Sequence, residues 1–272
     1  MARLEIILAL SATVLFCGCG GTPGPGPGSS ASAVPTAPPT PITPGNWQFT
    51  AASTVLGKPP LTFAGSIVGA GAAVSGALHV DGSSCFDRLT TIALTSTVTG
   101  NTTSLTSAAI DRQVVTFTGN FSGNTFNGTY RINGGCDGGD QGTLTGSNVW
   151  NIGNNLSGTF ANSAQKTFSV MGQIAQSDNA SSDGSFPITG TATFDTPCFS
   201  AGTIQQGTFP SGSFILGMSV ALEVETSKGT LTFLGNLDQS GDGALIGNYT
   251  VSGGGCDDSG TAVLQVAGKW DY

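Results

Sequence analysis

The stretch TFTGNFSGNTFNGTYRI, residues 116–132, alternates apolar and polar side chains on both sides of a central turn. Successive side chains of an extended chain point to opposite faces, so this alternation predicts two half-buried antiparallel strands joined near Asn124. Glycine takes apolar positions in both runs, which is typical of a sheet that bends sharply. The positions that share the predicted buried face are Val115, Phe117, Gly119, Phe121, Phe126, Gly128, Tyr130 and Ile132.

The chain carries this pattern a second time, as TFLGNLDQSGDGALIGNYTV at residues 232–251. A second pair of stretches occurs upstream in the same order: VSGALHVDGSSCF begins at Val74, and ITGTATFDTPCF begins at Ile188. Repetition in the same order and at similar spacing indicates that a whole domain has been duplicated. We therefore predict two tandem β domains, copy 1 at residues 46–150 and copy 2 at residues 151–272.

Copy 1 divides into short runs with strand periodicity, separated by turns rich in Gly, Asn and Asp. Short connections favour pairing between neighbours, and eight such strands can close into an up-and-down barrel without exposed edges. A β-sandwich is the alternative, because periodicity alone does not separate the two. The predicted fold class is all-β, with two antiparallel meanders that each form a barrel or a sandwich. The predicted strands lie at 46–53, 60–69, 72–81, 87–98, 103–110, 112–121, 124–133 and 140–149.

Composition and charge support strands and exclude several functions. The chain has 42 glycines among 272 residues and only 9% charged residues, so residues that favour helices are scarce. Its net charge is −8, and its 8 lysines and arginines are scattered singly. A nucleic acid or an anionic lipid surface therefore finds no basic patch to bind.

The N-terminal sequence MARLEIILALSATVLFCGCGG contains Arg3 and then an apolar run at 6–16, which is too short for a membrane-spanning helix and typical of a secretory signal. With glycines on both sides of Cys19, it resembles the signal and lipobox of bacterial lipoproteins. The resemblance implies a signal peptide at 1–19 and lipid attachment at Cys19. The membrane would then be a partner, and the protein would reside in the bacterial cell envelope, on the outer membrane, the cell surface or the periplasmic side. An ordinary signal peptide that releases a secreted protein is the alternative.

Residues 20–45 hold most of the 13 prolines, together with many Gly and Ser residues. Such a segment cannot bury a core, so it predicts a disordered, partly extended linker between the lipid and the first β domain.

Four cysteines remain after Cys17 and Cys19, and each copy contributes two at matching places. Disulfides persist in the oxidising compartments that an exported chain enters. Four cysteines allow three pairings, but duplication of a domain with its own bridge selects one of them. The predicted disulfides are Cys85–Cys136 and Cys198–Cys256.

Aspartates and glycines surround the second cysteine of each copy. We interpret Asp137, Asp140, Asp257 and Asp258 as turn residues that bind their own backbone. A calcium site is the alternative, since such loops supply oxygen ligands, but the two loops differ in sequence and neither has a known calcium-loop spacing. No metal site is predicted.

Catalytic groups are scarce. The chain has one histidine, His79, and copy 2 has Thr193 in its place, so we interpret it as a surface or hydrogen-bonded strand residue. Glu223 and Glu225 share one strand face that the alternation directs to solvent. No nucleophile elbow, zinc motif or nucleotide-binding loop occurs. The sequence predicts a protein that is not an enzyme and needs no cofactor.

Gly45-Asn46-Trp47 opens the first predicted strand and resembles the start of lipocalin and avidin barrels, the calycins. The resemblance implies a cavity for a small ligand at the mouth of the barrel. We therefore expect a lipid-anchored envelope protein whose β domains bind a small apolar ligand, or a surface glycan or protein. A structural or adhesive surface scaffold without a small-molecule ligand is the alternative.

Overall fold

The computed structural model describes residues 42–70, 73–238 and 243–269. All of them lie in one compact unit, Ala37–Tyr272. The predictions for the signal peptide, Cys19 and most of the linker fall outside the described residues. Every regular element that is described is a β-strand, and among these residues no helix is long and apolar enough to cross a membrane.

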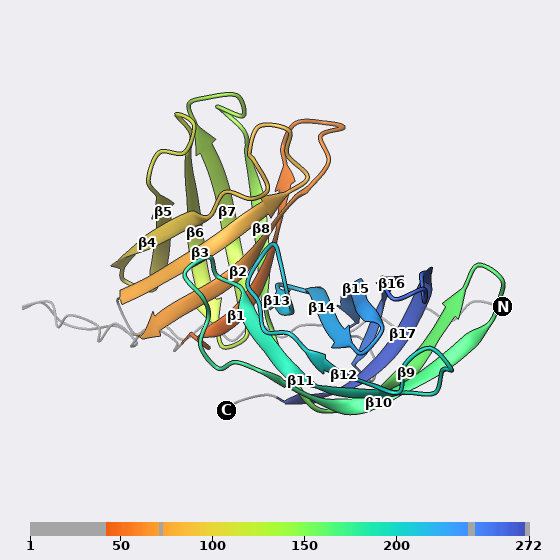
Figure 1. Ribbon diagram of the computed structural model, residues 1–272. Helices are drawn as coiled ribbons and strands as arrows, with labels where there is room; N and C mark the ends of the chain where they lie inside the picture. Colours follow the sequence, from red (N-terminus) through yellow and green to blue (C-terminus); the bar gives the residue numbers. More distant parts are fainter. Residues whose placement is uncertain (1–41, 71–72, 239–242, 270–272) are drawn as a thin grey trace, which may run out of the picture. The chain divides into compact units, whose positions relative to one another are not determined.

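Copy 1 forms a closed antiparallel barrel of strands β1 to β8, in which β1 pairs with both β2 and β8 (Figure 1). The predicted meander and its closure are confirmed, and the sandwich alternative is wrong. The predicted strand at 87–98 begins only at Ile92, because the residues before it form the loop that carries Cys85. The strands are β1 (Gly45–Ser53), β2 (Leu61–Ala70), β3 (Ala73–Asp81), β4 (Ile92–Thr99), β5 (Thr102–Ser107), β6 (Val114–Ser122), β7 (Thr125–Asn133) and β8 (Gln141–Val149).

Copy 2 is also a closed barrel, because β10, at one end of its sheet, pairs with β11 near the other end and closes the ring. It contains one additional strand, β13, which pairs with both β11 and β14. The strands are β9 (Asn151–Asn162), β10 (Thr167–Gln176), β11 (Phe186–Phe194), β12 (Ala201–Ile204), β13 (Phe214–Leu216), β14 (Ser219–Thr226), β15 (Gly229–Asp238), β16 (Ala244–Ser252) and β17 (Asp258–Lys269).

Aromatic side chains fill the interior of each barrel. In copy 1, Trp47 stacks on Phe49 at 5.7 Å between ring centroids, and Phe117 lies 5.6 Å from Phe49. In copy 2, Phe160 and Tyr249 pack edge to face at 4.9 Å. All five rings are inaccessible or nearly so. The period-two pattern therefore builds two apolar cores, each inside its own ring of strands.

The disulfides join Cys85 to Cys136 and Cys198 to Cys256, the pairing predicted from the duplication. The Cα atoms are 5.6 Å apart in the first pair and 5.9 Å apart in the second, within the usual range for a disulfide. Each bridge closes a loop within one copy, so neither links the two barrels covalently.

Candidate functional site

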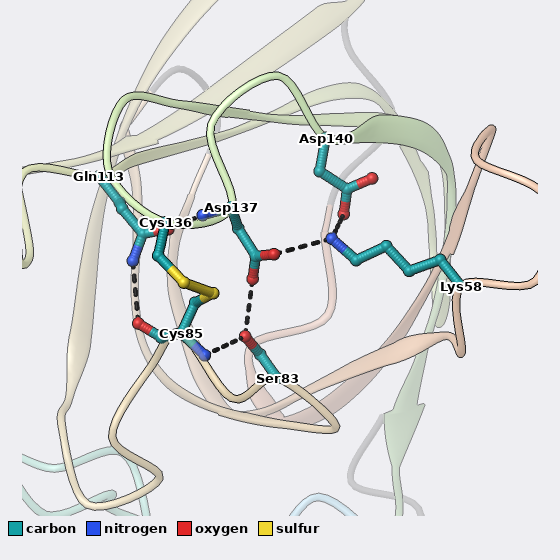
Figure 2. The surroundings of a disulfide bond; sticks show 7 residues. All are labelled: Lys58, Ser83, Cys85, Gln113, Cys136, Asp137 and Asp140. Atoms are coloured by element: carbon teal, nitrogen blue, oxygen red, sulfur yellow. Dashed lines mark hydrogen bonds and ion pairs between the residues drawn. A yellow bond between two sulfur atoms is a disulfide. The ribbon is translucent and has the colours of Figure 1, made fainter.

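The residues around the first disulfide form a charged cluster (Figure 2). Lys58 Nζ binds Asp137 Oδ1 at 2.8 Å and Asp140 Oδ2 at 2.9 Å. Ser83 donates its hydroxyl to Asp137 at 2.7 Å. Buried Gln113 ties the two cysteine loops together, because it donates to the carbonyl of Cys85 and accepts the N–H of Asp137.

Asp140 is the buried member of this cluster. It accepts the hydroxyl of Ser53 at 2.6 Å and that of Tyr130 at 3.0 Å, as well as the ion pair with Lys58. Burial raises the pKa of the Asp140 carboxyl, but the hydrogen bonds from Ser53, Lys58 and Tyr130 outweigh it and leave the pKa below its usual value. For Lys58 the signs are reversed: burial lowers the pKa of the ammonium group, but its two carboxylate partners outweigh burial and raise the pKa above the usual value. The interpretation of Asp140 as a turn residue that binds its own backbone is therefore wrong.

Copy 2 repeats the tyrosine–aspartate pair. Tyr249 donates to Asp258 at 2.8 Å, and Asn162 Nδ2 takes the place of a lysine at 3.2 Å. Burial and the hydrogen bond from the phenol to the carboxylate raise the pKa of Tyr249, and they raise the pKa of Tyr130 to about 12. Both copies have a tyrosine–aspartate pair, although the other partners of the aspartate differ. We therefore infer that the pair stabilises the cysteine end of each barrel.

Metal ligation has little support in this cluster. Among the described residues, no group of three or more His, Cys, Asp or Glu side chains is placed to hold a metal ion. The carboxylates of Asp137 and Asp140 both already bind the ammonium group of Lys58. Asp257 does accept a backbone N–H, that of Gly253 at 3.0 Å, as a turn residue would.

His79 belongs to the contact between the two barrels. Its Nδ1 lies 3.1 Å from the carbonyl oxygen of Arg88, and its Nε2 lies 3.0 Å from that of Asp183 in copy 2. Its ring centroid is 4.5 Å from that of Phe209. The side chain is buried. The interpretation of His79 as a hydrogen-bonded strand residue is therefore confirmed, and its interpretation as a surface residue is wrong.

Two polar side chains on the outer face of β1 complete this contact. Asn46 is fully buried, donates to the carbonyl of Gly217 and accepts its N–H, both at 2.8 Å. Gln48 Oε1 accepts the N–H of Met218 at 2.9 Å. Gly217 has a φ of +57°, and a Cβ atom there would lie 2.7 Å from Cβ of Ala64. Only glycine allows this close approach without strain.

An open groove of about 960 Å³, here called the junction groove, lies beside these contacts. Leu89 from copy 1 and Leu234 from copy 2 line it with 54% and 60% of their surfaces exposed. Its floor is formed by a small apolar cluster in which Phe214, Leu216 and Ala221 pack with Ala64 and Phe209. The groove is therefore a concave surface with exposed apolar side chains from both barrels.

The paired glutamates do not form a site. Val220, Leu222 and Val224 are buried in the core of copy 2, as the alternation predicted. Glu225 is exposed and Glu223 is half-buried.

The junction between the barrels was not predicted from the sequence. The polar residues that build it alternate correctly along strands, and nothing local distinguishes a solvated outer face from one covered by another barrel. One signal was available: the cysteines of the disulfides are 51 residues apart in copy 1 and 58 apart in copy 2, which indicates an insertion.

No protein-family model and no curated protein matches the chain. Among solved structures, the chain is similar to the crystal structure of kievitone hydratase from Nectria haematococca. The two are 9% identical, the match covers 83% of this chain and 89% of that chain, and the TM-score is 0.25. A likeness at this level carries no argument about family or activity.

Proposed function

We propose that this chain is a non-enzymatic binding protein that holds a small, largely apolar molecule in the junction groove. The observation that carries the proposal is that the apolar wall of this groove is exposed, whereas aromatic side chains fill both barrels. Ligand sites are typically concave, mostly apolar and frequent where two domains meet. The ligand site implied by the calycin resemblance would lie at the mouth of a barrel, so the proposed site between the barrels differs from it.

The chemistry of the groove suits a molecule with an apolar body and a polar end. Burying Leu89 or Leu234 under a ligand contributes about 1.5–3 kcal/mol for a complete side chain. Asp81, Asp87 and Arg88 line the same groove and supply charged groups that can orient a polar end.

Titration with the fluorescent apolar probe N-phenyl-1-naphthylamine tests this site. We expect saturable enhancement of its emission, and weaker binding by about 10-fold for Leu234→Asp, because a charge replaces an apolar contact. Ile246→Asp is the matched control. Ile246 lies on the neighbouring strand with 52% of its surface exposed, and it does not line the groove.

Leu89 lines the junction groove from copy 1, and Leu89→Asp should weaken binding of the probe by a similar factor. Both leucines are exposed, so neither substitution removes core packing. Equal affinity in wild type, Leu89→Asp and Leu234→Asp would rule out the junction groove as the site.

Two disulfides are typical of proteins in an oxidising, extracytoplasmic compartment. We propose in addition that Cys19 carries a lipid that anchors the chain in the bacterial cell envelope. The support is the sequence of the first residues together with this compartment. Cys19→Ala should move the protein from the membrane fraction to the soluble fraction, and an unchanged distribution would favour another mode of attachment.

A scaffold without a small-molecule ligand is the second candidate, favoured by the filled barrel interiors and by the polar contacts between the barrels. It predicts that the probe does not bind with saturation to wild type. It also predicts that protein purified from its native envelope shows a bare polypeptide mass in native mass spectrometry, apart from any covalent lipid.

A further inference from the structure

His79 lies between two carbonyl groups, one from each barrel. Its Nδ1 is 3.1 Å from the carbonyl oxygen of Arg88 in copy 1, and its Nε2 is 3.0 Å from that of Asp183, in the copy 2 loop between β10 and β11. The residue is only 5% exposed, so bulk water has little access to either contact. A carbonyl oxygen accepts hydrogen bonds and cannot donate them, so the histidine has to supply the proton in both contacts.

The two contacts distinguish the charged ring from the neutral one. A neutral imidazole has one N–H and one bare nitrogen, so it can donate to only one carbonyl and sets a lone pair against the other. The hydroxyl of Thr91 could donate to a bare Nε2, but at 3.5 Å it lies beyond the usual hydrogen-bond range and farther away than the carbonyl of Asp183. The imidazolium donates from both nitrogens. Since buried polar groups are nearly always paired, the geometry favours the imidazolium.

Two uncharged neighbours complete the surroundings of the ring. Phe209 of copy 2 lies with its ring centroid 4.5 Å from that of His79. This is within the distance of about 6 Å at which an aromatic ring attracts a cation. Ala64 is the cross-strand partner of His79 on β2 and carries no charge. Neither neighbour competes for the ring N–H groups, and the aromatic one favours a positive charge.

The charged groups around His79 are mostly carboxylates. Asp81 ends β3, and Asp87 and Arg88 lie in the loop that follows; all three line the junction groove with the histidine. Asp183 belongs to the facing loop of copy 2, where its carboxylate accepts the N–H and the hydroxyl of a serine. Burial opposes a charge on the ring, whereas three carboxylates against one guanidinium favour a positive one. The carboxylates and the two carbonyl contacts therefore act together against the effect of burial.

We propose that His79 is a pH-sensitive clasp between the two barrels. With both nitrogens protonated, it donates one hydrogen bond to Arg88 of copy 1 and one to Asp183 of copy 2. Loss of one proton leaves a single donor, so one of the two contacts is lost. By linkage, the contact is fully stabilised below about pH 6.5, where an ordinary histidine titrates, and weakens as the pH rises above that value. The clasp does not depend on the ligand proposed for the junction groove.

NMR of the ring tests the protonation step directly. The chain has one histidine, so its ring signals are assigned without ambiguity in ¹⁵N-labelled, full-length protein without a histidine tag. The ¹⁵N shifts of both ring nitrogens, read through the carbon-bound ring protons, report how many protons the ring carries. We expect two at about pH 5.5 and one at about pH 8. A ring with the same protonation state at both pH values would overturn the proposal, because it would not switch.

Hydrogen exchange of residues 181–185 measures the contact between the barrels. Expressed as protection factors, which remove the intrinsic effect of pH, their protection should be about 10-fold higher at pH 5.5 than at pH 8. His79→Gln keeps an amide donor but does not titrate, so it should remove this difference. Asp87→Asn is the matched control and should preserve the difference. Asp87 lines the same groove and accepts the N–H of Leu89, which asparagine can also do.

Two results with these variants would overturn the proposal. A difference in protection that persists in His79→Gln would belong to other titrating groups. Loss of the difference in Asp87→Asn would assign the titration to that carboxylate and not to the histidine. The NMR measurement on wild type decides the question even if His79→Gln does not fold.

Discussion

The two barrels share what closes them and differ in what joins them. Both have eight strands in the ring, one disulfide and a tyrosine–aspartate pair at the cysteine end. They differ between the fourth and fifth strands of the ring. Copy 1 turns there at Gly100 and Asn101, whereas copy 2 inserts residues 205–218 with strand β13. That insertion supplies Phe209, Phe214 and Gly217 to the junction. The repeated features therefore stabilise each barrel, and the unrepeated ones build the contact and the groove.

A second difference lies before the fourth strand. Copy 1 has a longer loop between Cys85 and Ile92 than copy 2 has between Cys198 and Ala201. That loop carries Leu89, which forms one wall of the junction groove. Both copies thus contribute to the groove through segments in which they diverge from each other.

The largest predicted effect concerns the disulfides, which the copies share. Replacing Cys85 and Cys136 by serine should lower the free energy of unfolding of copy 1 by up to about 4 kcal/mol, since a loop closed across 51 residues loses its constraint on the unfolded chain. The same change at Cys198 and Cys256 should act on copy 2 to a similar extent. Guanidinium unfolding of both variants measures this, and a stability equal to that of wild type in either variant would contradict a structural role.

The next effect separates the two tyrosine–aspartate pairs. Asp140→Asn should lower the free energy of unfolding by about 1–3 kcal/mol. It removes one of the two carboxylates that bind Lys58, and it weakens the hydrogen bonds from Ser53 and Tyr130. Asp258→Asn should cost less, because its partners Tyr249 and Asn162 are neutral. Urea unfolding of the two variants is the measurement. Equal losses would show that the ion pair in copy 1 adds nothing to the shared pair.

The acid dependence of stability follows from the same residue. The pKa of Asp140 in the folded chain is below its ordinary value of 3.8, so its stabilising contribution is present above that value and disappears as the pH falls through the lower folded pKa. Asp140→Asn should therefore flatten the decline in stability between about pH 5 and the acid limit. Thermal unfolding across this range tests the sign, and a decline as steep as in wild type would assign the acid sensitivity to other carboxylates.

The smallest effect concerns the junction itself. His79→Thr introduces the residue that copy 2 has at Thr193 and removes the contact with the carbonyl of Asp183. We expect a loss of about 1 kcal/mol and faster amide exchange in residues 181–185, with little change in the interior of either barrel. Hydrogen exchange by mass spectrometry resolves the two regions. Faster exchange in the core strands would mean that His79 supports the barrel of copy 1 and does not mainly serve the junction.

The sequence predicted the strands and the disulfides because each depends on local or repeated information. Alternation marks the buried face of β6 and β7, and duplication selects the pairing of the cysteines. The role of Asp140 could not be predicted, since Ser53, Lys58 and Tyr130 reach it only after the barrel closes. The junction could not be predicted either, because its contacts form only when the two barrels meet. Asn46 and Gln48 are polar and point outward from β1, as solvated residues also do.

The calycin resemblance implies a ligand cavity at the mouth of the barrel, whereas the tryptophan of the motif belongs to a cluster of buried aromatic side chains. Trp47 of the motif is buried and stacks on Phe49, while Phe121 packs edge-on at 5.3 Å. Periodicity shows which residues point inward, but it does not show whether they leave a space between them.

We propose that a ligand binds between the barrels and not inside them. Intermolecular nuclear Overhauser effects from N-phenyl-1-naphthylamine to methyl groups of the labelled protein test it directly. We expect contacts to the methyl groups of both Leu89 and Leu234, which lie on different barrels and line the junction groove. Contacts to the interior methyl groups of Leu105 or Leu245 would place the ligand within a barrel and rule out the junction groove as the site.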